Sequence, residues 1–125
     1  MLTKSIRRRQ VLRASGFVII WEFRITPRKR LAFERAYGPD GEWAKFFEKG
    51  IGYLGTELIR DARESDRYIT LDYWKSRTDH ETFKQQNRKM YEIIDERSEA
   101  LTTKEVEIGK FSRRVASAAR RKSNN

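Results

Sequence analysis

The sequence contains no cysteine and only one histidine, and its longest uninterrupted apolar run covers only residues 17–21. The lack of cysteine excludes a disulfide scaffold, a thiolate metal site and a cysteine nucleophile, and it is the composition expected of a cytoplasmic protein. One histidine is too few for a zinc or non-haem iron site, which needs two or three nitrogen or sulfur ligands. The apolar run is far shorter than the roughly 20 residues that span a bilayer.

Two segments, residues 1–16 and 112–125, contain neither acidic nor aromatic residues. Each carries five lysines and arginines, and these ten account for the formal net charge of +10. Residues 17–111 are neutral, with 18 charges of each sign and all 15 aromatic residues. We therefore predict one domain over residues 17–111, with a disordered basic extension before it and a disordered basic tail after it. Nucleic acid or an anionic membrane would be bound only through these tails.

The basic extension begins like an export signal, because Arg7 and Arg8 precede a few apolar residues. Such a signal needs an apolar stretch of about 7–15 residues before its cleavage site. Glu22 and Arg24 interrupt the stretch after five apolar residues. We therefore interpret residues 1–16 as a solvated basic extension.

The pattern of apolar residues predicts the order β-α-α-β-β-α-β. Residues 17–25 are apolar at every odd position, which is typical of a strand with one buried face. We expect helices over residues 27–37 and 42–49, strands over 54–61, 67–74 and 105–111, and a long helix that begins at a capping box of Thr78 and Glu81 and breaks near Lys89. This order predicts a ferredoxin-like α+β fold, an antiparallel sheet with the helices on one face.

The other face of the sheet is too apolar for water at one end, because it carries Val18 and Ile20. A second copy of the chain, packed face to face, is the simplest cover. We therefore expect a homodimer.

Three stretches of the central domain resemble the antibiotic biosynthesis monooxygenase-like family of dimeric α/β barrels. They are Gly38-Pro39-Asp40-Gly41-Glu42-Trp43, Gly52-Tyr53-Leu54-Gly55-Thr56-Glu57-Leu58 and Asp72-Tyr73-Trp74-Lys75-Ser76. The resemblance covers about residues 17–111. It implies this fold, a dimer and a pocket, and the superfamily includes cofactor-free oxygenases of polycyclic quinols and haem-degrading oxygenases.

The residues that these relatives use for catalysis carry over only in part. The haem-degrading relatives use an Asn, a Trp and a His, where an ungapped placement puts Phe23, Phe83 and Ile93 in this chain. The cofactor-free relatives use an Asn four residues before the strand-three Trp, and this chain has Thr70 before Trp74. Only the Trp carries over, so the resemblance implies a pocket but does not establish a reaction. None of the haem-degrading residues matches, and without an axial histidine there is no haem ligand, so we expect neither a cofactor nor a metal.

Asp72 and Trp74 are the first candidates, since they share one side of the predicted third strand with Thr70. A buried carboxylate can act as a general base, and an indole can pack on a flat substrate and donate a hydrogen bond. The alternatives are an ion pair of Asp72 with Arg24 or Arg60, and a Trp74 that belongs to the core.

His80 and Asn87 complete the candidate catalytic set. His80 can move a proton near neutral pH, and Asn87 can hold an anion by a hydrogen bond. The alternative for both is exposure, for His80 at the helix terminus inside the predicted capping box. Substrate-binding candidates are the aromatic residues Trp21, Phe23, Phe83 and Tyr91, which either line a pocket or fill it.

Two functions remain open at this point. The first is a cofactor-independent monooxygenase that holds a small aromatic or quinol-like compound in an apolar pocket between sheet and helices. The second is a non-catalytic small-molecule-binding or structural homodimer of the same fold.

Overall fold

The computed structural model describes residues 16–114 of the chain. The elements in chain order are β1 (Gly16–Arg24), α2 (Arg30–Tyr37), α3 (Glu42–Phe47), β2 (Tyr53–Arg60), β3 (Arg67–Trp74), α4 (Arg77–Gln86), α5 (Arg88–Ser98) and β4 (Lys104–Arg113). The predicted order β-α-α-β-β-α-β is confirmed. The basic segments expected to be disordered lie, apart from residues 16 and 112–114, outside the described residues.

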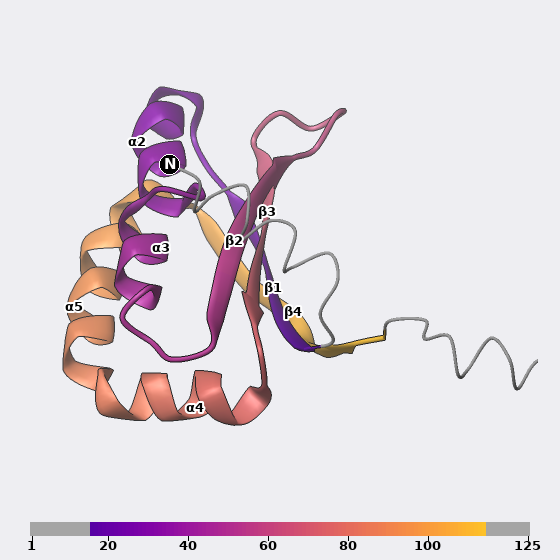
Figure 1. Ribbon diagram of the computed structural model, residues 1–125. Helices are drawn as coiled ribbons and strands as arrows, with labels where there is room; N and C mark the ends of the chain where they lie inside the picture. The colour runs from indigo at the N-terminus through magenta and orange to yellow at the C-terminus, as the bar shows by residue number, and fades with distance from the viewer. Residues whose placement is uncertain (1–15, 115–125) are drawn as a thin grey trace, which may run out of the picture.

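The four strands form one antiparallel sheet in the order β2-β3-β1-β4. The helices lie on one side of it, and the other side carries none of the described elements (Figure 1). This is the predicted ferredoxin-like arrangement. None of the described helices is long and apolar enough to cross a membrane.

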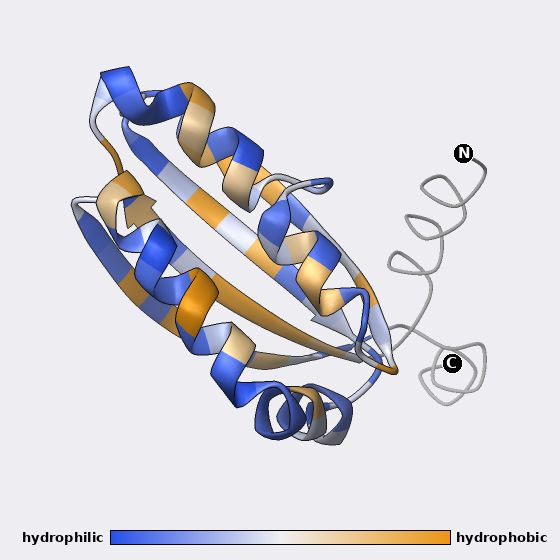
Figure 2. Cartoon of the chain, turned by 90° about the vertical axis from the view of Figure 1, so that its left-hand side faces the viewer, coloured by the Kyte–Doolittle hydropathy of each residue, from blue (hydrophilic) through white to orange (hydrophobic). Residues whose placement is uncertain are grey.

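The odd-numbered residues of β1 anchor the core, as their alternation predicts. Phe17, Ile19 and Phe23 are each at most 5% exposed and face the helices. They meet Phe33 of α2 and Trp74 of β3, which are completely buried. Burial of each such side chain stabilises the fold by about 1.5–3 kcal/mol. The core therefore lies between β1, β3 and the helix layer, which Figure 2 shows in front of the sheet.

The predicted capping box at Thr78 is wrong, because the helix begins at Arg77, two residues earlier than that box requires. Ser76 is the N-cap of α4, and its hydroxyl accepts a hydrogen bond from the backbone N–H of Asp79 at 3.0 Å. Before α2, Pro27 begins a short 3-10 turn over Pro27–Lys29. Thr26 precedes this turn, and its side chain makes no capping hydrogen bond. The break in the long helix falls at Asn87, between α4 and α5, two residues before the expected Lys89.

Gly52 turns the chain from α3 into β2 with a backbone φ of +90°, a region that glycine enters without strain. A Cβ at this position would also lie 2.2 Å from a carboxylate oxygen of Asp79. The turn fixes the start of β2 against the start of α4.

The face of the sheet without helices is more apolar than β1 alone indicates. Val18 is already buried within the single chain and Ile20 is half-buried. Three other apolar side chains are more exposed, with 39–52% of their surface accessible: Ile59 of β2, and Val106 and Phe111 of β4. The strand register places these three on the same face as Ile20, because Phe111 pairs with Val18, Val106 with Glu22 and Ile59 with Ile69.

Replacing Phe33 by alanine tests the position of the core. We expect Phe33→Ala to lower the free energy of unfolding by about 3–5 kcal/mol, because the buried ring leaves a cavity. Leu31→Ala, on the same helix but 69% exposed, should change it by no more than about 0.5 kcal/mol. Urea unfolding followed by circular dichroism measures both, and equal losses would contradict this assignment of the core.

Candidate functional site

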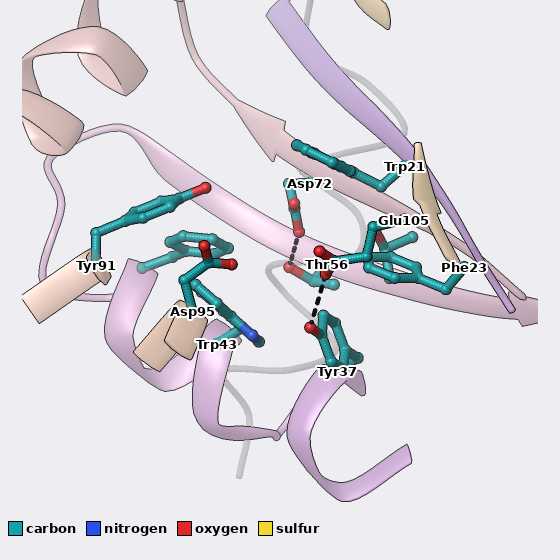
Figure 3. A pocket seen from close by; sticks show the side chains of 11 residues that line it. Trp21, Phe23, Tyr37, Trp43, Thr56, Asp72, Tyr91, Asp95 and Glu105 are labelled. Carbon is teal, nitrogen blue, oxygen red and sulfur yellow. Dashed lines mark hydrogen bonds between the residues drawn. The ribbon is translucent and has the colours of Figure 1, made fainter. Parts of the chain in front are cut away.

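A pocket of about 60 Å³ lies between the helix-facing side of the sheet and helices α2, α3 and α5. Its walls are six aromatic side chains, Trp21, Phe23, Tyr37, Trp43, Phe47 and Tyr91. Its polar residues are Thr56, Thr70, Asp72, Asp95 and Glu105. Figure 3 shows Asp72 and Thr56 on the sheet, with Tyr91 and Asp95 approaching from α5.

Asp72 is held by a chain of two hydrogen bonds that runs across β2. The Thr56 hydroxyl donates to an Asp72 carboxylate oxygen at 2.7 Å (Figure 3). The hydroxyls of Tyr53 and Thr56 are 2.6 Å apart. The strand register causes this contact, because Thr56 and Asp72 are directly opposite each other in the β2–β3 pair. Burial raises the pKa of Asp72 to about 6, although the hydrogen bond from Thr56 acts in the opposite direction.

The alternative of an ion pair between Asp72 and Arg24 or Arg60 is wrong. Arg24 contacts Glu64 at 3.1 Å and Asp66 at 3.2 Å, both near the β2–β3 hairpin loop. The pleat of the sheet explains the error, because Arg24 is an even-numbered residue of β1 and points to the face opposite Asp72. No described residue forms an ion pair with Asp72.

His80 is buried, so the alternative of a solvated histidine at the helix terminus is wrong. It is 7% exposed, and its ring centre lies 5.3 Å from that of Trp74 and 6.1 Å from that of Phe17. Burial, with smaller contributions from Lys84 and Lys110, lowers the pKa of His80 to about 4. The imidazole is therefore neutral at neutral pH and is a weaker base than Asp72.

Trp74 is completely buried and belongs to the aromatic core, which was the alternative left open for it. Its ring packs against Tyr53 at 5.3 Å and Phe83 at 5.4 Å between ring centres. It also borders a narrower hollow of about 20 Å³ beside the pocket, together with Asp72 and His80. Its indole N–H finds no hydrogen-bond partner among the described residues.

The four aromatic candidates divide into three that line the pocket and one that does not. Trp21, Phe23 and Tyr91 line it, whereas Phe83 packs in the core against Phe46, with 4.9 Å between ring centres. Tyr91 lies among several carboxylates, and burial together with the charge of Asp72 raises the pKa of its hydroxyl.

Asn87 does not lie among the residues that line the pocket. Its side-chain amide donates to the backbone carbonyl of Phe83 at 2.9 Å, where α4 ends. Asn87 is four residues before Tyr91 in the sequence, but this spacing does not bring its amide to the pocket, because the helix breaks at Asn87 itself.

Seven lining residues were not among the predicted site residues: Tyr37, Trp43, Phe47, Thr56, Thr70, Asp95 and Glu105. Thr56 could have been found from the sequence, because counting the β2–β3 register back from the hairpin loop places it opposite Asp72. Asp95 is adjacent to Glu96 and close to Glu92 and Glu99 in the sequence, a pattern typical of a solvated helix face, and only the packing of α5 brings it to the mouth of the pocket. There the Tyr37 hydroxyl donates to Glu105 at 3.3 Å, and burial and the charge of Asp95 raise the pKa of Glu105.

No family model matches the sequence, and no curated protein matches it significantly. Solved structures do match in fold. A single-residue variant of SnoaB, a cofactor-independent oxygenase from Streptomyces nogalater, superimposes with a TM-score of 0.66 at 18% identity, over 82% of this chain and 96% of that one. PA3566 from Pseudomonas aeruginosa gives 0.57 at 17% identity, over 82% and 96%.

A protein from Nitrosomonas europaea, provisionally assigned as an antibiotic biosynthesis monooxygenase, gives a TM-score of 0.56 at 16% identity, over 77% of this chain and 88% of that one. At these identities the likeness concerns the fold. The expected resemblance to antibiotic biosynthesis monooxygenase-like proteins is confirmed at that level.

The hydrogen bond between Thr56 and Asp72 generates a test of the site. Thr56→Val removes the donor that stabilises the charged carboxylate, so the pKa of Asp72 should rise above its value of about 6. A hydrogen bond to a charged group is worth about 1.5–3 kcal/mol, which corresponds to a rise of roughly one to two pH units. Thr56→Ser, which keeps the hydroxyl, should leave the pKa nearly unchanged. Carbon-13 NMR titration of the Asp72 carboxyl measures all three proteins, and an unchanged pKa in Thr56→Val would contradict the arrangement.

Proposed function

We propose that this protein is a cofactor-independent monooxygenase that acts on a small aromatic or quinol-like compound bound in the aromatic pocket. The observation that carries the proposal is Asp72, a carboxylate with a pKa raised to about 6, inside a pocket with aromatic walls. A general base works best when its pKa is near the working pH. The fold is shared with SnoaB, a cofactor-independent oxygenase, which favours the same reaction class.

In this reaction Asp72 takes a proton from a hydroxyl group or an activated carbon of the substrate, which leaves an electron-rich anion. The anion transfers an electron to O₂, and the two radicals join in a carbon–oxygen bond. The resulting peroxide takes up a proton. Loss of the second hydrogen from the same carbon then breaks the O–O bond and releases water. One CH₂ group and O₂ thus become a carbonyl group and water, and the substrate itself supplies all four electrons.

The other residues have supporting roles in this proposal. Trp21, Phe23 and Tyr91 hold the flat substrate, and Thr56 positions Asp72. Trp74 bounds the hollow beside Asp72, and its buried indole N–H, which has no partner among the described residues, donates to a substrate oxygen that enters this hollow. His80, with its lowered pKa, is neutral in this role and accepts a proton less readily than Asp72.

The alternative is a non-catalytic binding or structural homodimer of the same fold. The small volume of the pocket, about 60 Å³, favours it, because roughly four to six water molecules would fill that space. A quinol with several fused rings would need the helices to move apart.

We propose a homodimer for either function. The face of the sheet without helices exposes Ile59, Val106 and Phe111 beside half-buried apolar neighbours. An apolar sheet face of this kind is covered at low cost by the same face of a second copy.

Oxygen uptake tests the proposed reaction. Purified full-length protein should consume O₂ with some member of a panel of hydroquinones, naphthols and anthrones, faster than buffer alone. Because Asp72 acts in its charged form, the rate constant kcat/KM should rise up to pH about 6 and level off above it. Asp72→Asn should lower it about 10²–10⁴-fold. An oxygen electrode measures the uptake between pH 5 and 8.

Asp66→Asn is the matched control, since it makes the same chemical change beside the exposed β2–β3 hairpin loop. It should leave oxygen uptake unchanged. Uptake that survives in Asp72→Asn would contradict the assigned base, and no uptake with any compound would favour the binding dimer.

The oligomeric state has its own test. Sedimentation equilibrium should give a mass of twice 14.9 kDa. Phe111→Glu places a charge in the middle of the proposed interface and should weaken the dimer more than about tenfold. Leu31→Glu, on the helix side and 69% exposed, should leave the dimer intact. A monomeric wild-type protein would contradict the homodimer.

A further inference from the structure

The two ends of the pocket differ in charge. At one end Asp95 of α5 and Glu105 of β4 face the aromatic walls, and none of the residues that line the pocket is a lysine or arginine. At the other end Asp72 also borders the narrower hollow, and there Lys84 and Lys110 are present. A ligand that spans the pocket therefore has only negative charges near one end of the pocket, and charges of both signs near the other.

Neither Asp95 nor Glu105 forms an ion pair with a described residue. Lys84 and Arg88 lie in the open hollow on the outer side of Asp95, where Lys84 covers the Tyr91 ring, and neither of them lines the aromatic pocket. The ion pairs of residues 16–114 involve other carboxylates, such as Glu22 with Arg67 and Glu42 with Arg97. Asp95 and Glu105 act on each other as like charges, and this interaction, after burial, raises the pKa of Glu105. A positive group placed between them would relieve the repulsion.

Aromatic rings surround the same end of the pocket. The ring centres of Trp43 and Tyr91 are 5.1 Å apart and those of Tyr37 and Trp43 are 6.3 Å apart (Figure 3). Ring faces attract cations, and sites for organic ammonium groups combine such rings with nearby carboxylates. In the described part of the chain, no three His, Cys, Asp or Glu residues are grouped closely enough to hold a metal ion. The geometry therefore fits an organic cation, whose charge is spread over a larger group.

We infer that the ligand of this pocket is an aromatic alcohol that carries a protonated amine. Its ammonium group lies between Asp95 and Glu105, against the rings of Tyr37 and Trp43, because Lys84 already covers the Tyr91 ring. Its hydroxyl group points to Asp72 at the other end. The choice of an aromatic alcohol rests on the proposed function, whereas the ammonium site rests on the charges and rings of the pocket alone.

The amine also answers a difficulty in the proposed chemistry. Removal of a proton from the substrate by Asp72 creates an anion close to several carboxylates, which raises its energy. An ammonium group on the substrate supplies a positive charge inside the pocket, and Lys84 and Lys110 supply a second source beside Asp72. A substrate with a carboxylate tail would instead meet Asp95 and Glu105 as like charges.

Three phenols of similar size separate these cases. Tyramine carries an ammonium group, 4-propylphenol is neutral, and 3-(4-hydroxyphenyl)propanoate carries a carboxylate. Isothermal titration calorimetry on the full-length protein, under argon, measures binding without any turnover. We expect tyramine to bind at least fivefold more tightly than 4-propylphenol, and the propanoate to bind more weakly than both. Raising the salt from 20 to 300 mM should reduce the preference for tyramine, because Asp95 and Glu105 are partly open to solvent.

Glu105→Gln and Asp95→Asn remove the charges while keeping the shapes of the side chains, and Glu105→Gln also keeps an oxygen that can accept from Tyr37. Each should weaken tyramine binding about three- to tenfold and leave 4-propylphenol unchanged. Glu96→Gln is the control, since it removes the same charge from the neighbouring residue of α5, whose side chain does not line the pocket. Circular dichroism establishes that each variant is folded.

The inference is overturned if tyramine does not bind, if 4-propylphenol or the propanoate binds as tightly as tyramine, or if the two variants affect all phenols equally. Binding of tyramine, together with no oxygen uptake on any compound of the panel, would refute the proposed reaction and keep the ammonium site. Oxygen uptake with neutral quinols, without a preference for tyramine in binding, would keep the proposed reaction and refute the ammonium site.

Discussion

The alternation of side chains along β3 places one carboxylate on a face that is otherwise apolar. Thr70, Asp72 and Trp74 all point toward the helices, where the aromatic residues of β1 and the helices exclude water. An ionised group in such a place is costly unless it has a partner. Here the partner is the Thr56 hydroxyl, which is neutral, so Asp72 keeps a pKa near 6 instead of the low value of an ion-paired aspartate. The pocket and its chemistry depend on this one placement.

The same burial has opposite effects on the two candidate bases. It raises the pKa of the Asp72 carboxyl and lowers that of the His80 imidazole, because in each case it disfavours the charged form. Asp72 is mostly uncharged below pH about 6 and His80 is mostly uncharged above pH about 4, so both groups are mostly uncharged between these two values. Above pH 6 the carboxylate is ionised while the histidine stays neutral, so Asp72 is the better suited of the two to act as the proposed base, and His80 is an aromatic neighbour of Trp74.

The fold and the chemistry come from different parts of the sequence. The β1 alternation, the glycine turn at Gly52 and the buried Trp74 build an architecture that is shared with SnoaB and PA3566 at less than 20% identity. The polar residues of the pocket come from four separate elements, β2, β3, α5 and β4, and they can change while the core stays the same. Similar folds can therefore hold pockets with different charges, and the charges at the mouth of this one are acidic.

The order of the elements, the buried face of β1 and the shared side of Thr70, Asp72 and Trp74 were predictable from the sequence. They depend on local periodicity, and a period of two or of 3.6 residues can be read directly along the chain. The partners of these residues were not predictable in the same way. Asp72 bonds to Thr56 and not to an arginine, His80 is buried and not solvated, and Asp95 and Glu105 meet at one pocket although they come from α5 and β4. Such contacts depend on strand register and on how helices pack across the sheet, and only the tertiary structure decided them, because residues far apart in the chain are brought together by the burial of the whole core.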